Sequence, residues 1–164
     1  MRGIVLMVAL AACGSDDVDL TGIYKVDLDV GSSPCGSDAP VMMPPAFLKF
    51  HQEDFIGAKY FAFDTCTDAA ATMCDGGGLF TGFTEPTDKG WKGLAYGSSF
   101  GGSCLLSFDE RIATLDGTKL LIEIHSYVEN DATLSDAQCT TDEAKKRGDK
   151  MPCDMHERIE ATQQ

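Results

Sequence analysis

A long apolar hairpin constrains the fold of this chain more than any other feature of its sequence. Residues 105–115 and 119–128 are both rich in apolar side chains, and Asp116 and Gly117 lie between them. An Asp-Gly pair tolerates the positive φ angles of a tight turn between antiparallel strands. One face of the second arm is purely apolar and consists of Leu120, Ile122 and Ile124. A strand of this kind buries its apolar face, so the segment predicts a hairpin in the core.

The first expected strand of the domain begins at Leu20 and shows the same alternation. Apolar and charged side chains follow each other with the two-residue period of a strand that has one buried face. The residues expected to face the core are Tyr24, Val26, Leu28 and Val30. The residues expected to face solvent are Lys25, Asp27 and Asp29.

Shorter apolar runs, separated by turn residues, fill most of the remaining chain. We expect further strands at 47–50, 59–64, 79–84, 91–96 and 155–161, with a turn over 51–57 and an irregular excursion over 31–45. About eight antiparallel strands predict a single all-β domain over residues 20–164, built as a barrel or a two-sheet sandwich.

One short helix is expected late in the chain, at residues 141–147. Thr140 precedes it and Glu143 lies three residues further on, which is the spacing of a capping box. Gly148 follows the last basic residues and is expected to end the helix.

The N-terminus carries the three parts of a secretion signal. Arg2 supplies a positive charge, an apolar stretch follows over residues 4–12, and small residues precede Cys13. The stretch is too short to cross a bilayer as a helix. The pattern therefore favours a cleaved signal over a transmembrane segment.

The segment Leu10-Ala11-Ala12-Cys13 resembles the lipobox of bacterial lipoproteins. The resemblance implies that residues 1–12 form a signal peptide, that the Cys13 sulfur carries a lipid, and that residues 13–19 form a lipidated tether. It also implies a lipid-anchored protein of the cell envelope. Gly14 after the modified cysteine is compatible with the outer membrane.

Reserving Cys13 for lipid leaves an even number of cysteines, which is typical of a disulfide framework in an exported protein. None of them forms the C-x-x-C spacing of a zinc or redox site. The cysteines expected in disulfides are Cys35, Cys66, Cys74, Cys104, Cys139 and Cys153. Spacing alone leaves their connectivity open. In a meander, strand ends that share a rim favour Cys35 with Cys66 and Cys74 with Cys104, and the third pair, Cys139 with Cys153, would bracket the helix.

Thirteen basic and 26 acidic side chains give the chain a formal net charge of −13. Nucleic-acid binding requires a basic surface, so this balance disfavours a nucleic-acid partner. It also disfavours flat adsorption to anionic headgroups, which leaves the lipid on Cys13 as the expected membrane contact. Scattered carboxylates usually form a solvated, self-repelling surface, and we expect that role here.

A G-x-S-x-G pattern at residues 97–101 places Ser99 where a hydrolase nucleophile would lie. His125 or His156 follows as a candidate base. The hydrolase nucleophile requires a turn from a strand into a helix, whereas residues 102–106 lead into an expected strand. We therefore predict no catalytic residue and no enzymatic activity, and a serine hydrolase is the least favoured alternative.

The remaining motifs do not predict a cofactor or a metal. The histidines, His51, His125 and His156, lack ligand spacing, and the acidic segments 27–29 and 129–131 lack a calcium loop, so we expect these segments to be solvated. Residues 74–78 lack the Lys and Ser/Thr of a phosphate loop. Aromatic side chains of the second and third strands can line a ligand cavity or fill the core, and we expect the core. They are Phe47, Phe50, Tyr60, Phe61 and Phe63.

The expected strand count is similar to that of lipocalin-like barrels. Gly22-Ile23-Tyr24 resembles part of their Gly-x-Trp signature, without its tryptophan. The chain is also similar to small cysteine-containing lipoproteins of Gram-negative bacteria. These resemblances imply a membrane-anchored envelope lipoprotein that serves as a structural or protein-interaction module. The alternative is a lipocalin-like carrier of a small apolar ligand.

Overall fold

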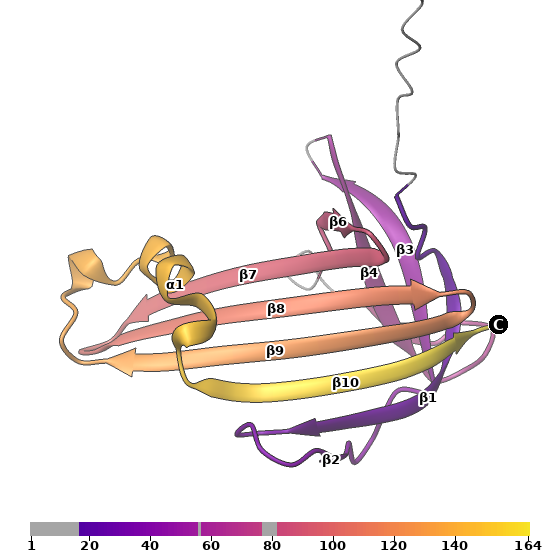
Figure 1. The fold of residues 1–164 in the computed structure, drawn as a ribbon, viewed down its shortest axis with the longest axis horizontal. Coiled ribbons are helices and arrows are strands. Elements are labelled where there is room, and N and C mark those ends of the chain that lie inside the picture. The colour runs from indigo at the N-terminus through magenta and orange to yellow at the C-terminus, as the bar shows by residue number, and fades with distance from the viewer. Residues whose placement is uncertain (1–16, 56, 77–81) are drawn as a thin grey trace, which may run out of the picture.

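A computed structural model describes residues 17–55, 57–76 and 82–164 of the chain. One antiparallel sheet curls into a half-barrel, and a short helix lies against it (Figure 1). The strand order is β5-β4-β3-β1-β10-β9-β8-β7-β6, with β2 beside β1. This arrangement confirms the predicted all-β, mainly antiparallel fold with one short helix.

The elements have the following bounds. The strands are β1 Gly22–Ser32, β2 Ala39–Pro40, β3 Phe47–Phe55, β4 Ala58–Cys66, β5 Cys74–Asp75, β6 Glu85–Thr87, β7 Gly90–Phe100, β8 Cys104–Asp116, β9 Lys119–Asp131 and β10 Cys153–Gln163. The helix α1 covers Thr141–Arg147, between the 3₁₀ turns η2 (Asp136–Gln138) and η3 (Gly148–Lys150).

The central hairpin is the one that the sequence predicts. Strands β8 and β9 pair along their full lengths, from Asp116 opposite Lys119 to Cys104 opposite Asp131. Gly117 in the turn has a φ of 59°, a value that a glycine adopts without steric cost. One nearby prediction needs correction. Strand β3 continues through most of the expected turn at 51–57, because it stays paired with β4.

Residues 79–81 of the strand expected at 79–84 lie outside the described residues, and Phe83 forms an isolated bridge in the described part of the chain. Phe83 and Phe61 exchange two backbone hydrogen bonds, with N···O distances of 2.7 and 3.0 Å. This bridge links β4 to the segment before β6. The two ends of the sheet therefore meet at this point, which gives the sheet its curl.

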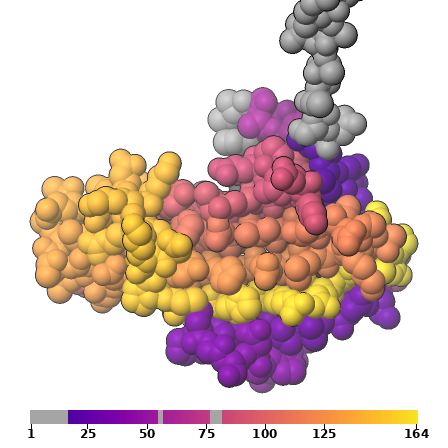
Figure 2. Space-filling model, viewed as in Figure 1, coloured from indigo at the N-terminus to yellow at the C-terminus, as the bar shows by residue number. Residues whose placement is uncertain are grey.

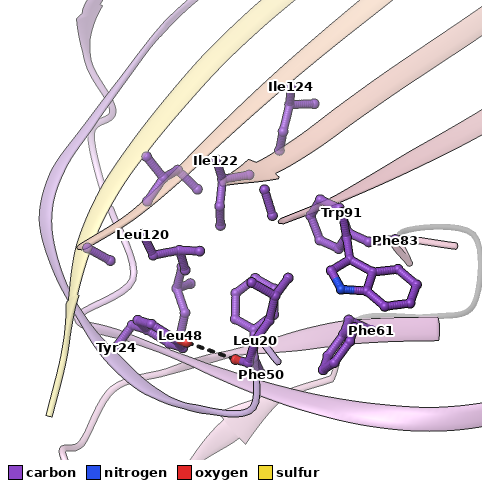
Figure 3. Packing of buried hydrophobic residues seen from close by; sticks show 13 residues of the cluster. Leu20, Tyr24, Leu48, Phe50, Phe61, Phe83, Trp91, Leu120, Ile122 and Ile124 are labelled. Carbon is purple, nitrogen blue, oxygen red and sulfur yellow. Dashed lines mark hydrogen bonds between the residues drawn. The ribbon is translucent and has the colours of Figure 1, made fainter. Parts of the chain in front are cut away.

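Aromatic and aliphatic side chains fill the inner face of the curl (Figure 3). The Phe50 ring is 1% exposed and lies 5.6, 5.2 and 5.9 Å from the rings of Tyr24, Phe63 and Phe83. Phe61 belongs to the same cluster. The expected core role is confirmed for Phe50, Phe61 and Phe63, whereas Phe47 is only half-buried and Tyr60 is buried beside Glu53.

A second, smaller core lies on the outer face of the sheet, under α1. Phe108 and Ala113 of β8 are five residues apart and belong to different clusters, as expected for side chains on opposite faces of one strand. Ala144 of α1 is fully buried in the outer cluster. The long strands thus have a different buried face at each of their two ends.

The helix begins and ends where the sequence predicts. The Thr140 hydroxyl accepts a hydrogen bond from the Glu143 backbone N–H at 3.2 Å. The Glu143 carboxylate binds Arg147 at 3.0 Å, and Arg147 also pairs with Glu129 and Asp131 of β9 at 2.9 Å each. The predicted capping box therefore supplies its hydroxyl cap, while its glutamate helps to fasten the helix to the sheet.

All six predicted disulfide cysteines are paired, but the predicted connectivity is wrong for every pair. The observed bonds are Cys35–Cys153, Cys66–Cys74 and Cys104–Cys139. The prediction assumed that strands adjacent in sequence share a rim. Instead β10 returns to pair with β1, with Ser32 opposite His156, so Cys35 meets Cys153. Strands β4 and β5 pair directly, which places Cys66 opposite Cys74.

Candidate functional site

A β-bulge in β1 overturns the predicted exposure of its charged residues. The pairing of β1 with β10 shifts register between Val26 and Leu28. A bulge adds one residue and so exchanges the two faces of the strand beyond it. Leu28, expected in the core, is 38% exposed, whereas Asp29, expected in solvent, is 6% exposed. The bulge therefore directs a carboxylate toward the inner face of the sheet.

Asp29 interacts there with Glu157 of β10. The register places Asp29 opposite Ile159 and Glu157 opposite Gly31, so the two carboxylates lie diagonally across the β1–β10 pair. Burial raises the pKa of Asp29 above its usual value. Burial also raises the pKa of Glu157, and the charge and hydrogen bonding of Asp29 raise it further. Two carboxyl groups that hydrogen-bond to each other do so through one shared proton.

A pocket of about 590 Å³ lies at this end of the sheet, and Glu157 is one of its lining residues. Its walls are mostly apolar. They come from the end of β1, from β2 and the segment after it, and from the start of β10. The lining residues include Val41, Met42, Met155, His156 and Glu157.

An exposed methionine pair lies beside the pocket. Met42 is 95% exposed and Met43 is 88% exposed, and Val41 before them is 36% exposed. We call residues 41–43 the methionine loop. In Figure 2 the purple region that contains it projects below β10 (yellow). The backbone of the loop is held to the sheet, because the Val41 N–H donates to the Asp29 carbonyl at 3.1 Å.

The exposure of the methionine loop could have been predicted from the sequence. Two consecutive methionines precede Pro44 and Pro45 in a segment that was expected to be irregular. Large apolar side chains in a proline-rich segment cannot alternate into a core strand. The carboxyl pair of Asp29 and Glu157 could not be predicted in this way, because the bulge that creates it depends on the pairing of β1 with β10.

The tertiary structure brings together two histidines that are far apart in sequence. His125 of β9 lies opposite His156 of β10, with ring centroids 4.6 Å apart. The His156 Nδ1 lies 3.1 Å from the Asp38 carboxylate. His51 is separate on β3 and contacts Glu53 at 3.0 Å. In the described part of the chain, no group of three or more His, Cys, Asp or Glu side chains is arranged to hold a metal ion.

Ser99 lies far from both His125 and His156, the histidines that the sequence offered as its base. It is part of β7 and pairs with Leu105, whereas His125 is in register with Glu110 and Leu94. Five residues of strand separate Ser99 from that row, which corresponds to about 16 Å. Residues 97–100 of the G-x-S-x-G segment thus belong to a paired strand, and the segment leads into β8 and not into a helix.

The two acidic segments are only partly solvated, which corrects the expectation for them. Asp27 pairs with Lys119 at 3.4 Å, and Asp131 pairs with Arg147. Bonds from Thr133, together with Arg147, lower the pKa of Asp131 to about 2. Only Gly76 of the glycines at 76–78 is described, and Cys74 before them is in a disulfide.

The predicted lipidation site, Cys13, lies outside the described residues. Val18, near the start of the described residues, packs against the inner core. Its carbonyl accepts a hydrogen bond from the Trp91 indole N–H at 2.6 Å. None of the helices in the described ranges has both the length and the apolar character needed to span a bilayer. Comparison with protein families, curated proteins and solved structures found no match.

Proposed function

We propose that the chain is a lipid-anchored envelope protein without enzymatic activity, whose β-domain presents a binding surface to a protein partner. The observation that carries the binding role is the methionine loop, where Met42 and Met43 expose almost their entire side chains. Methionine side chains are flexible and polarisable, and they are common on surfaces that bind other proteins. Burial of this loop by a partner would remove apolar surface from water.

The scaffold beneath the loop supports this proposal. The Cys35–Cys153 disulfide connects the segment before β2 to the start of β10. The loop also follows directly from the β1–β2 pairing, in which Val30 lies opposite Pro40. A loop held at its base binds with a smaller entropy cost than a free segment does. The fold therefore presents the two methionines on a constrained base.

The envelope location is supported by the cysteines and by the lipobox resemblance. All six cysteines after Cys13 form disulfides, and such bonds persist outside the reducing cytosol. Cys13 is the seventh cysteine of the sequence, and it stands at the position where the resemblance places the lipid. The acidic domain is attached through that lipid and not through its own surface.

The alternative role as a carrier of a small ligand is favoured by one observation. The inner face of the curl is filled by side chains, but the pocket beside the methionine loop has a volume of about 590 Å³. Ligand pockets commonly have volumes of about 300–1,000 Å³. A carrier would therefore hold its ligand at the rim of the sheet.

Replacing Cys13 with serine tests the anchor. In a Gram-negative host we expect Cys13→Ser to abolish labelling by a palmitate analogue and to move the protein from the membrane to the soluble fraction, because two or more acyl chains are needed for stable attachment. Cys13 is the residue changed, so the disulfides remain as an internal check of folding. Unchanged labelling and membrane association of the variant would exclude the proposed anchor.

Photo-crosslinking in intact cells tests the binding surface. A photoreactive phenylalanine derivative at Met42 should yield a discrete crosslinked species, since a partner covers this side chain. The matched control is Met73, which is 65% exposed on the segment before β5 and should yield none. Met42→Ser with Met43→Ser should also weaken co-purification of the crosslinked partner about tenfold, as expected for loss of interface anchors. Equal crosslinking at Met42 and Met73 would count against the methionine loop as the binding surface.

A further inference from the structure

The segments around the methionine loop carry acidic charge and contain no Lys or Arg. Asp38 is the only charged residue among residues 31–46, which include the loop. Residues 153–157 at the start of β10 add Asp154, which is exposed, and Glu157. A disulfide joins these two segments, and both contribute to the walls of the pocket. The methionine loop therefore has an acidic border.

The pocket beside the loop offers a place for a large apolar side chain. Its volume of about 590 Å³ is lined by Met155 of β10 and by Val41 and Met42 of the loop. Met155 packs against the inner core, which fixes that wall. Met42 is 95% exposed, and its flexible thioether chain adapts to the shape of a partner. Apolar anchors seated in such pockets supply much of the binding energy at protein interfaces.

The backbone at this edge of the sheet is unsuited to pairing with an extended peptide. Strand β2 covers the edge of β1 here, with Val30 opposite Pro40, and it is only two residues long. Pro40, Pro44 and Pro45 also lack the backbone N–H that an added strand requires. A partner therefore has to bind through side chains. An amphipathic helix that lays its apolar face on a surface binds in this way.

We propose that the methionine loop and its pocket bind an amphipathic helix of a partner protein whose polar face is rich in Lys or Arg. The apolar face of the helix covers Met42 and Met43, and its basic side chains meet the acidic border. The net charge of −13 attracts such a helix from solution, and the loop decides where it binds. The inference rests on the function proposed for this surface and names the class of partner.

Binding is measured by fluorescence anisotropy with the full chain that carries Cys13→Ser. The first probe is a labelled peptide of about five helical turns, with Leu on one face and Lys on the other. The second has Glu in place of every Lys. The third has the composition of the first in a scrambled order, so that its Leu side chains share no face. We expect the first peptide to bind at least about tenfold more tightly than either of the others.

Substitutions in the loop separate this binding from general attraction of a basic peptide to an acidic protein. Met42→Ser with Met43→Ser leaves the net charge unchanged and should weaken binding of the first peptide about tenfold, as expected for loss of interface anchors. The matched control is Met73→Ser, at a side chain that is 65% exposed, and it should bind like the parent.

A second pair of variants tests the acidic border. Asp154→Asn should weaken binding of the first peptide about threefold, the size expected for one exposed charge at the border of an interface. Asp88→Asn removes the same charge from the exposed turn between β6 and β7 and should have no effect. Equal effects of the two substitutions would contradict a role for this border.

The proposal is also overturned if the scrambled or the Glu-containing peptide binds as tightly as the first, or if the double Met variant binds it like the parent. Sedimentation velocity tests a second copy of the chain as the occupant. A dimer that is lost in the double Met variant would assign the loop to self-association and reject the proposal. A partner crosslinked at Met42 in cells, together with failure of the first peptide to bind, would retain the binding surface and reject only the partner class.

Discussion

Phe50→Ala should lower the free energy of unfolding by about 3–5 kcal/mol, the range observed when a buried phenylalanine is truncated. Phe50 is 1% exposed, and its ring contacts those of Tyr24, Phe63 and Phe83. These rings come from β1, β4 and the bridge before β6, so the substitution leaves a cavity where the two ends of the sheet meet. Urea unfolding followed by circular dichroism measures the change.

Phe100→Ala is the matched control for this substitution. Phe100 ends β7 and is 41% exposed, so its truncation should change stability by less than about 0.5 kcal/mol, as is usual for surface positions. A similar loss in both variants would mean that Phe50 does not fill a close-packed core. A typical domain has a stability of only about 5–15 kcal/mol. Phe50→Ala therefore removes a large part of what holds the half-barrel closed.

Replacement of Cys35 and Cys153 by serine should have the second largest effect. This disulfide joins residues 118 positions apart, and the entropy of closing so long a loop corresponds to about 5 kcal/mol. The Cys66–Cys74 bond closes a loop with a separation of only 8 residues, which corresponds to about 2.5 kcal/mol. The two double-serine variants should thus differ in stability by about 2.5 kcal/mol.

Urea unfolding of both double-serine variants, under conditions that keep the other disulfides oxidised, measures this difference. The Cys66 and Cys74 variant serves as the control, because it loses the same number of sulfur bonds and keeps the link between β1 and β10. Equal destabilisation would contradict the loop-entropy explanation. A larger loss in the Cys66 and Cys74 variant would contradict that explanation as well.

Local signals predicted the parts of the fold that depend on neighbours in sequence. Asp116 and Gly117 specify their own turn, and Thr140 caps its helix through a bond to a residue three positions away. Each of these features is decided within a few residues. The alternation in β9 also identifies its buried face, because Leu120, Ile122 and Ile124 are all in the core.

The candidate site was not predictable in the same way. The bulge between Val26 and Leu28 exists only against β10, and it turns Asp29 from a solvent-facing position into a buried one. The contact of His125 with His156 and the bond between Cys35 and Cys153 depend on the same return of β10 to β1. A single sequence does not specify which distant strands become neighbours.

The sequence by itself thus determined a β-rich chain with a hairpin, a capped helix, an even set of disulfide cysteines after Cys13, and a strongly acidic surface. Those properties follow from residue types and short-range spacing. The tertiary structure alone decided the disulfide pairing, the burial of Asp29 beside Glu157, and the pocket next to the methionine loop. The physical reason is that strand order and register are set by the packing of the whole sheet, and a shift of one residue exchanges the faces of a strand.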